Sequence, residues 1–254
     1  MQLPSTPSLR LDGRRAIVTG AGRGIGVGLA AALAQAGASV TLVARTADQI
    51  DVVASAISES GGDAEAAVLD VADIGAVQRF FADRPAYHIL VNNAGTNRPK
   101  PFLDVTQDDY DAVLDLNLKS AFFVAQACAR RMIETDTKGS LIHIGSQMGH
   151  VAAPNRSLYC ASKWALEGMS KALALDLAAH DIRSNIIAPT FIETPMTRPF
   201  FEDAQFRLTV LSKIKLGRIG LVEDLMGPLL LLASDASALM TGTSLLVDGG
   251  WTAD

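Results

Sequence analysis

The stretch Thr19-Gly-Ala-Gly-Arg-Gly-Ile-Gly26 (TGAGRGIG) places four glycines in eight residues, directly after the apolar run Ala16-Ile-Val18. A strand, a glycine-rich turn and a helix in this order form a phosphate-binding unit, because bare backbone lets a pyrophosphate approach the helix N-terminus. The spacing here is Gly20-x-x-x-Gly24-x-Gly26, which differs from the G-x-G-x-x-G pattern. Alone, the stretch is weak evidence, because a turn that only lets a helix pack on a sheet is an alternative explanation.

Short β-branched or apolar runs alternate along the rest of the chain with longer segments of helical periodicity. The predicted strands are Ala16–Thr19, Ser39–Val43, Ala64–Leu69, Ile89–Val91, Ser140–Ile144, Arg183–Ile187 and Ser244–Val247. The predicted helices are 25–36, 47–59, 73–82, 107–134, 158–179 and 223–233. Such alternation implies right-handed βαβ crossovers. We therefore predict an α/β fold, a Rossmann-like doubly wound parallel sheet of about seven strands with helices on both faces.

No linker, repeat or low-complexity tract divides the chain, so residues 1–254 are predicted to form one catalytic domain. The helix at 107 has its own start signal, because Thr106-Gln-Asp-Asp109 matches a capping box. The segment 190–216 is the longest without a clear pattern. Because open α/β sheets bind ligands at the carboxyl ends of their strands, we expect this segment to form a lid over the substrate.

Composition narrows the classes of partner. A formal charge of −5 without a long basic run argues against nucleic acid or an anionic membrane. No run of 18 apolar residues occurs, and the start MQLPSTPSLR lacks the features of a signal peptide. The two cysteines, Cys128 and Cys160, and the histidines lack metal-ligand spacing. We expect a cytoplasmic protein that binds no metal, no nucleic acid and no membrane.

A tyrosine and a lysine four residues apart, Tyr159 and Lys163, indicate acid–base chemistry. This spacing places both side chains on one face of the predicted helix. Free tyrosine has a pKa of about 10, and a nearby cation favours the phenolate. Ser146, which follows a predicted strand and a glycine, can donate a hydrogen bond to a substrate oxygen. Each feature alone also fits a surface pair or an ordinary loop serine.

Taken together, the motifs resemble the main subgroup of the short-chain dehydrogenase/reductase family. The resemblance covers nearly the whole chain, in order, and consists of TGAGRGIG, Asn92-Asn-Ala-Gly95, Asn117, Ser146, Tyr159-x-x-x-Lys163 and Val247-Asp-Gly-Gly250. It implies an enzyme that transfers hydride between a nicotinamide cofactor and a carbonyl or secondary alcohol. In the family's pattern, Tyr159 is the acid/base and Lys163 lowers its pKa and holds the nicotinamide ribose. Ser146 orients the substrate oxygen, and Asn117 supports a water-linked proton relay.

The resemblance also implies the cofactor contacts. Asp70-Val71 stands where the family contacts adenine, and Ile192-Glu-Thr194 resembles the segment that holds the carboxamide. Pro189-Thr190 replaces the usual Pro-Gly, which puts only the local backbone of that loop in doubt. The expected cofactor-binding residues are Gly20, Gly22, Arg23, Gly24, Ile25, Gly26, Arg45, Asp70, Val71, Asn92, Ala94, Gly95, Tyr159, Lys163, Pro189, Ile192 and Thr194.

The end of the second predicted strand favours NADP(H) over NAD(H). Enzymes that use NAD place an acid there for the ribose hydroxyls, whereas an arginine suits a 2′-phosphate. This chain reads Val43-Ala44-Arg45-Thr46, with Arg23 as a second cation in the glycine stretch. Guanidinium groups bind phosphate oxygens in bidentate fashion. NAD(H) is the alternative if both arginines are only solvated.

Polar residues near the expected pocket favour a hydroxylated or anionic substrate. The expected contacts are Arg98, Gln147, His150 and Arg156. The order Asn92-Asn-Ala-Gly-Thr-Asn-Arg98 resembles gluconate 5-dehydrogenase-like relatives, so a polyol, sugar or sugar acid is the leading substrate class.

Two alternatives and one assembly accompany this interpretation. A 3-oxoacyl-carrier-protein reductase shares every motif, and it would need a basic surface for its acidic carrier, for which Arg130 and Arg131 are the obvious pair. Solvation at a helix end also explains that pair. A nucleotide-binding sensor without turnover is the second alternative, and the intact set Asn117, Ser146, Tyr159 and Lys163 argues against it. The resemblance implies a homotetramer or homodimer, formed through the helices at 107–134 and 158–179.

Overall fold

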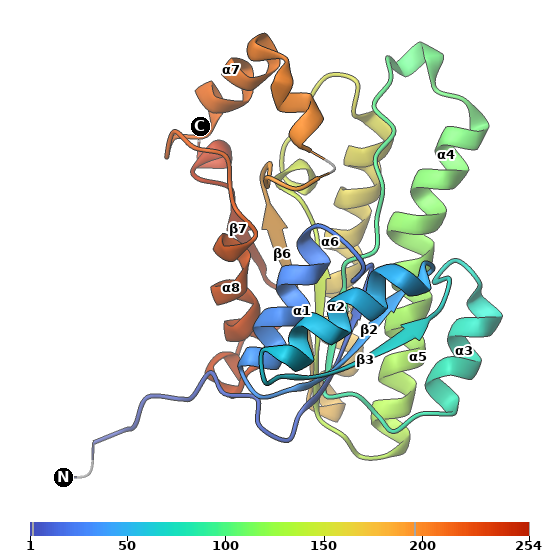
Figure 1. Ribbon diagram of the computed structural model, residues 1–254, viewed down its shortest axis with the longest axis vertical. Helices are drawn as coiled ribbons and strands as arrows, with labels where there is room; N and C mark the ends of the chain where they lie inside the picture. Colours follow the sequence, from blue (N-terminus) through green and yellow to red (C-terminus); the bar gives the residue numbers. More distant parts are fainter. Residues whose placement is uncertain (2, 196, 254) are drawn as a thin grey trace.

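The computed structural model describes residues 1, 3–195 and 197–253, and its centre is a seven-stranded parallel sheet (Figure 1). The strand order is β3-β2-β1-β4-β5-β6-β7. The strands are β1 (Arg15–Thr19), β2 (Ser39–Ala44), β3 (Asp63–Val68), β4 (Ile89–Asn92), β5 (Gly139–Ile144), β6 (Ile182–Pro189) and β7 (Ser244–Val247). The predicted Rossmann-like doubly wound sheet is confirmed, and the strand ends agree with the prediction to within two residues.

The helices lie where helical periodicity predicted them, with two differences. They are α1 (Ile25–Gln35), α2 (Ala47–Glu59), α3 (Ile74–Ala82), α4 (Gln107–Leu114), α5 (Ser120–Glu134), α6 (Ser157–Leu177), α7 (Ala204–Lys213) and α8 (Glu223–Ala233). The predicted helix 107–134 contains a π-helical turn, Asp115–Lys119, between α4 and α5. The capping box is present, because Thr106 Oγ1 accepts from the Asp109 N–H and Asp109 accepts in return from the Thr106 N–H.

Helix α7 corrects the expectation that 190–216 is irregular throughout. Asp203 caps this helix by accepting hydrogen bonds from the backbone N–H groups of Gln205 (2.9 Å) and Phe206 (3.2 Å). A one-turn helix, Arg198–Glu202, precedes it. Only Val210 of α7 is buried. The helix therefore lacks the apolar stripe by which periodicity identifies helices, and its capping residue was the available signal.

Alternate strand residues enter two different cores, one on each face of the sheet. In β1, Ala16 and Val18 belong to the core covered by α1, α2 and α8, whereas Ile17 belongs to the core covered by α3, α5 and α6. Successive strand side chains point to opposite faces, so both faces of the sheet are buried. Since β1 pairs with β2 on one side and β4 on the other, the loops after β1 and β4 meet at a topological switch point.

The continuous helical run Gln107–Glu134 is long and apolar enough, by length and composition alone, to span a membrane. In the structure, Val124, Cys128 and Met132 of this run are buried in the core beneath α5. Packing against the sheet therefore accounts for its apolar character.

A buried histidine on β5 makes the stability of the fold depend on pH. His143 is fully buried, and its ring nitrogens lie 3.2 Å from Asn92 Nδ2 and 3.4 Å from Ser184 Oγ. Burial lowers the pKa of His143 to about 4, from 6.5. As the pH falls from 6.5 to 4, the unfolded chain therefore binds a proton that the folded protein does not.

We expect protonation of unfolded His143 to lower the free energy of unfolding by ~3 kcal/mol across this pH window. His143→Gln should remove that part of the pH dependence. Urea denaturation of both proteins at pH 7 and pH 4.5 measures the effect. An equal loss of stability in both would contradict the prediction.

Candidate active site

The glycine turn between β1 and α1 forms one end of the site. No side chain caps the first N–H groups of α1, and no acidic residue occupies its first turn. A Cβ atom at Gly26 would lie 2.3 Å from the Gly20 carbonyl oxygen, and one at Gly20 would lie 3.0 Å from Ala94 Cα. The backbone of the glycine turn thus packs directly against neighbouring backbone. The positive N-terminal end of α1 has no side-chain cap and no acidic residue in its first turn. This geometry fits the pyrophosphate of a dinucleotide.

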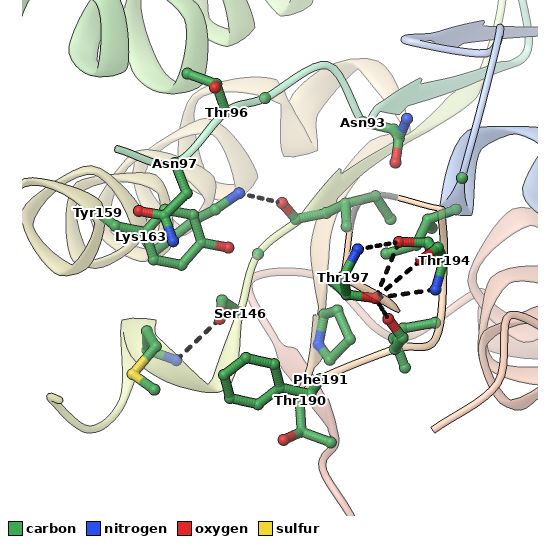
Figure 2. A pocket seen from close by; sticks show the side chains of 18 of the residues that line it. Asn93, Thr96, Asn97, Ser146, Tyr159, Lys163, Thr190, Phe191, Thr194 and Thr197 are labelled. Atoms are coloured by element: carbon green, nitrogen blue, oxygen red, sulfur yellow. Dashed lines mark hydrogen bonds between the residues drawn. The ribbon is translucent and has the colours of Figure 1, made fainter. Parts of the chain in front are cut away.

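A cavity of about 520 Å³ begins at the glycine turn and extends across the carboxyl ends of the strands to Tyr159. Segments that follow β1, β4, β5 and β6 line it, together with the start of α6. Figure 2 shows Ser146, Tyr159 and Lys163 on one side of this space and Thr194 and Thr197 on the other. The cavity therefore joins the phosphate-binding end predicted from the sequence to the predicted acid–base residues.

Strand β5 and helix α6 bring the predicted catalytic side chains together. Ser146 directly follows the Ile144-Gly145 end of β5, and its Oγ donates to Gln147 Oε1 (2.9 Å). The Lys163 ammonium donates to the Ile144 carbonyl oxygen (2.8 Å) and lies 5.6 Å from the centre of the Tyr159 ring. Ser146 and Lys163 are buried, whereas Tyr159 is half-buried and lines the cavity.

Burial is the largest influence on the pKa values of Tyr159 and Lys163 in this wall of the cavity. It raises the pKa of Tyr159 above its ordinary value, and the Ser146 hydroxyl acts in the opposite direction. Burial also lowers the pKa of Lys163 to about 8, an effect that the Glu167 carboxylate opposes. The sequence-based expectation was that Lys163 lowers the pKa of Tyr159. In this structure, desolvation of the phenolate outweighs any such effect.

Asn117 lies in the π-helical turn and holds the loop after β4. Its Oδ1 accepts from the Thr96 N–H (2.7 Å), and its Nδ2 donates to the Thr96 carbonyl oxygen (2.9 Å) and to Ser162 Oγ (3.1 Å). The side chain is buried and does not line the cavity. The π-helical turn therefore positions Asn117 between the β4 loop and α6, which agrees with the frequent occurrence of such turns at functional sites.

The expected cofactor-binding residues divide into two groups. Those that line the cavity are Gly20, Arg23, Gly24, Ile25, Ala94, Gly95, Tyr159, Lys163, Pro189, Ile192 and Thr194. Those outside its lining are Gly22, Gly26, Arg45, Asp70, Val71 and Asn92. Arg45 and Asp70 lie just beyond the ends of β2 and β3, with 4.0 Å between their charged groups. They are exposed at the side where the adenosine half of a dinucleotide would extend.

Asn92 has a structural role that its motif did not reveal. Its Nδ2 donates to the Ala121 carbonyl oxygen (2.9 Å) and contacts His143, so this side chain belongs to the core. The next residue, Asn93, lines the cavity and donates to the carbonyl oxygens of Thr19 (2.9 Å) and Gly20 (3.1 Å). Asn93 was not among the expected contacts, although it stands in the same Asn-Asn-Ala-Gly motif.

Of the expected substrate contacts, Gln147 and Arg156 line the cavity, whereas Arg98 and His150 do not. Arg98 lies 3.3 Å from the buried Asp109 carboxylate. His150 Nε2 contacts Glu167 Oε1 (3.1 Å) and Ser244 Oγ (3.0 Å), behind the cavity wall. The structure thus gives Arg98 and His150 partners within the protein and does not bring them to the site.

The remaining lining residues were not among the individually expected contacts, although many of them belong to the predicted lid segment 190–216. They include Thr96, Asn97, Met148, Thr190, Phe191, Pro195, Thr197 and Phe200. The Thr197 hydroxyl lies close to the Ile192 and Thr194 backbone, since it donates to the Ile192 carbonyl oxygen (2.6 Å) and accepts from the Thr194 N–H (2.9 Å). Phe191 packs against Phe206 of α7 and against Trp251. These contacts connect the 190–216 segment to the C-terminal region.

Comparisons with known proteins agree with this geometry. A family model described as Enoyl-(Acyl carrier protein) reductase matches residues 20–252. D-erythrulose reductase of Gallus gallus is 39% identical over 245 residues, covering 96% of this chain and 98% of the relative. L-xylulose reductase of Bos taurus is also 39% identical, with 96% and 99% covered. The crystal structure of a gluconate 5-dehydrogenase from Burkholderia cenocepacia J2315 in complex with NADP and tartrate is 39% identical, with a TM-score of 0.92 and 97% and 98% covered.

Proposed function

The chain belongs to the short-chain dehydrogenase/reductase family of oxidoreductases, and from this premise we propose that it interconverts a secondary alcohol and a ketone on a polyol, a sugar or a sugar acid, with NADP(H) as cofactor. One observation carries the proposal. Ser146, Tyr159 and Lys163 meet at one end of a cavity whose other end is a glycine turn suited to pyrophosphate. The relatives named for erythrulose, xylulose and gluconate support the substrate class.

We propose that different lining residues would hold the pyrophosphate, the nicotinamide ribose and the carboxamide of the cofactor. The N–H groups at the start of α1 would hold the pyrophosphate, and Lys163 would hold the nicotinamide ribose. Thr194, near the opposite wall, would contact the carboxamide. When bound, the cofactor supplies or accepts the hydride. The 190–216 segment, anchored by the contacts of Phe191, would act as the lid.

The chain's own residues manage the proton on the reacting oxygen. Tyr159 donates a proton to the carbonyl oxygen during reduction and accepts one from the alcohol during oxidation. Ser146 donates a hydrogen bond to the same oxygen and stabilises the charge that develops there. Burial raises the pKa of Tyr159, so the phenol is protonated and can act as the proton donor. Asn117 would support the water-linked relay that returns the proton.

A substrate panel tests this function. Ketoses, keto-aldonates, polyols, aldonates and a 3-oxoacyl thioester would be supplied with each nicotinamide cofactor, and absorbance of the reduced nicotinamide would be followed. We expect turnover of ketoses or keto-aldonates with NADPH. Turnover of the thioester alone would overturn the proposed substrate class.

A single substitution at the end of β2 tests the cofactor preference. Ala44 lies beside the glycine turn, because a Cβ at Gly22 would be 3.7 Å from the Ala44 Cβ. In Ala44→Asp, a carboxylate would repel a 2′-phosphate and accept hydrogen bonds from ribose hydroxyls. We expect the ratio of kcat/KM for NADPH over NADH to exceed one in the wild type and to fall at least ~10-fold in the variant, about 1.4 kcal/mol. An unchanged ratio, or one below one in the wild type, would contradict the preference.

For the alternative, a 3-oxoacyl-carrier-protein reductase, the arginine pair expected to bind the acidic carrier lies away from the cavity. Arg130 and Arg131 lie in the last turns of α5, which leads into the amino end of β5. The cavity opens at the carboxyl ends of the strands, so this pair is at the opposite edge of the sheet. Arg131 also donates to the Arg84 carbonyl oxygen (3.1 Å). The proposed assignment is therefore the sugar-type substrate.

The proposed assembly is a homotetramer or homodimer that pairs the faces of α4, α5 and α6. Tyr110, Phe122 and Trp164 on these helices are exposed, and Phe122 lines an apolar groove with Met169. Light scattering would show a dimer or tetramer, and Phe122→Asp would shift it toward monomer; a monomeric wild type would contradict the assembly.

The proposed location is the cytoplasm, which accords with two free, buried cysteines.

A further inference from the structure

Arg156 is a cation in the cavity wall without an acidic partner. It is the residue before α6, three positions ahead of Tyr159, and both side chains line the cavity. Its one hydrogen bond among the described residues is a long contact (3.5 Å) to the Asn155 carbonyl oxygen, and no carboxylate of residues 1, 3–195 and 197–253 pairs with it. Burial lowers the pKa of Arg156, and the acidic groups that act on it are the Tyr159 phenol and the Cys160 thiol.

An unpaired, half-buried guanidinium reduces the stability of the folded protein. Arginine stays charged in proteins, and a charge removed from water without a partner raises the free energy of the folded state. An anion bound in the cavity would remove that cost through charge-assisted hydrogen bonds, and a carboxylate matches the planar fork of the guanidinium.

Three neutral polar groups of the same cavity also lack hydrogen-bond partners within the described part of the chain. Gln147 is 2% exposed, and its Oε1 accepts from Ser146, but no partner contacts its Nε2. The Thr190 hydroxyl is buried without a partner. The Asn97 amide has no hydrogen bond among the described residues and lines the same cavity as Tyr159 and Lys163. Gln147 and Thr190 are buried, and buried polar groups are normally satisfied. Together with the half-buried Asn97 amide of the same cavity, they indicate a ligand that carries several hydroxyl groups.

We infer that the substrate is a polyhydroxylated carboxylate, a keto-aldonate or its alcohol, whose carboxylate binds Arg156 while its hydroxyl groups bind Gln147, Asn97 and Thr190. The inference rests on the proposed function and selects the sugar acid from the wider class of polyols, sugars and sugar acids. It assigns the carboxylate contact to Arg156 and not to Arg98, which lies outside the cavity and pairs with Asp109.

Matched substrate pairs test the inference. Keto-aldonates of four to six carbons would each be compared with the ketose that carries CH2OH in place of the carboxylate; 5-keto-D-gluconate and L-sorbose are one such pair. We expect wild-type kcat/KM to favour the acid. Arg156→Gln should lower kcat/KM for the acid on the order of 10- to 100-fold and change the value for the ketose less than about threefold. Arg156→Lys should retain part of the preference.

Two controls separate this role from a general loss of structure. Arg98→Gln removes an arginine outside the cavity and should leave the acid-to-ketose preference unchanged. Tartrate and threitol, which share a four-carbon skeleton, would be compared as inhibitors, and Arg156→Gln should raise the inhibition constant of tartrate only. Thermal melting would confirm that each variant is folded.

The outcomes distinguish this inference from the proposed function. An equal loss on acid and ketose, or a wild-type preference for the ketose, would overturn the role of Arg156 while leaving a sugar oxidoreductase in place. Turnover of neither, with reduction of a 3-oxoacyl thioester, would overturn both.

Discussion

Tyr159→Phe is expected to lower kcat by ~10²–10⁴-fold, because it removes the hydroxyl that transfers the proton and leaves the rest of the site in place. The aromatic ring, which has the Lys163 ammonium 5.6 Å from its centre, is retained. Binding of NADPH should therefore change little. Single-turnover absorbance measurements would give the rate, and fluorescence titration would give the Kd for NADPH.

Tyr110→Phe is the matched control for this variant. Tyr110 is exposed on α4, outside the cavity, so loss of its hydroxyl should leave kcat unchanged. A Tyr159→Phe enzyme that kept more than a tenth of wild-type kcat would exclude Tyr159 as the acid/base. Equal losses in both variants would show that the effect is not specific to the site.

Gly26→Ala is expected to weaken NADPH binding on the order of 10- to 100-fold. The added Cβ would lie 2.3 Å from the Gly20 carbonyl oxygen and 2.7 Å from Asn93 Nδ2. Backbone cannot move aside as a flexible side chain can, so the glycine turn must shift and its hydrogen bonds with Asn93 must weaken. Overpacking of this kind costs ~1–3 kcal/mol. Calorimetric titration with NADPH measures the loss.

Gly227→Ala provides the corresponding control in α8. A Cβ at Gly227 would meet no atom within 4 Å, and alanine favours helix, so this variant should bind NADPH normally and be slightly more stable. If Gly26→Ala bound NADPH as tightly as the wild type, the glycine turn would not be the pyrophosphate site. Circular dichroism would exclude unfolding as the cause of lost binding.

Local sequence patterns predicted the parts of the structure that depend on near neighbours. All seven strands follow from short β-branched or apolar runs, because strands of a parallel sheet covered on both faces are rich in such residues. The start of α4 follows from Thr106 and Asp109, which bond each other three residues apart. The shared cavity wall of Tyr159 and Lys163 follows from their spacing of one helical turn.

Long-range partners explain the expectations that differed. Arg98 faces Asp109, and His150 faces Glu167 and Ser244, and no local pattern shows that these groups meet. Asn92 and Asn93 are adjacent in one motif, yet strand alternation sends one to the core and the other to the cavity. Helix α7 was missed because it is held by a cap and by aromatic contacts rather than by an apolar stripe.

The amino-acid sequence alone predicted the order of strands and helices, the glycine turn and the acid–base pair. Each of these features depends on residues within a few positions of one another. Tertiary packing alone determines which arginine side chains pair with a carboxylate and which do not. Nothing in the sequence distinguishes Arg98 from Arg156. In the folded chain, Arg98 pairs with the Asp109 carboxylate, whereas Arg156 lines the cavity without a carboxylate partner among the described residues. Burial likewise sets the pKa of Tyr159, because desolvation depends on every element packed around the phenol.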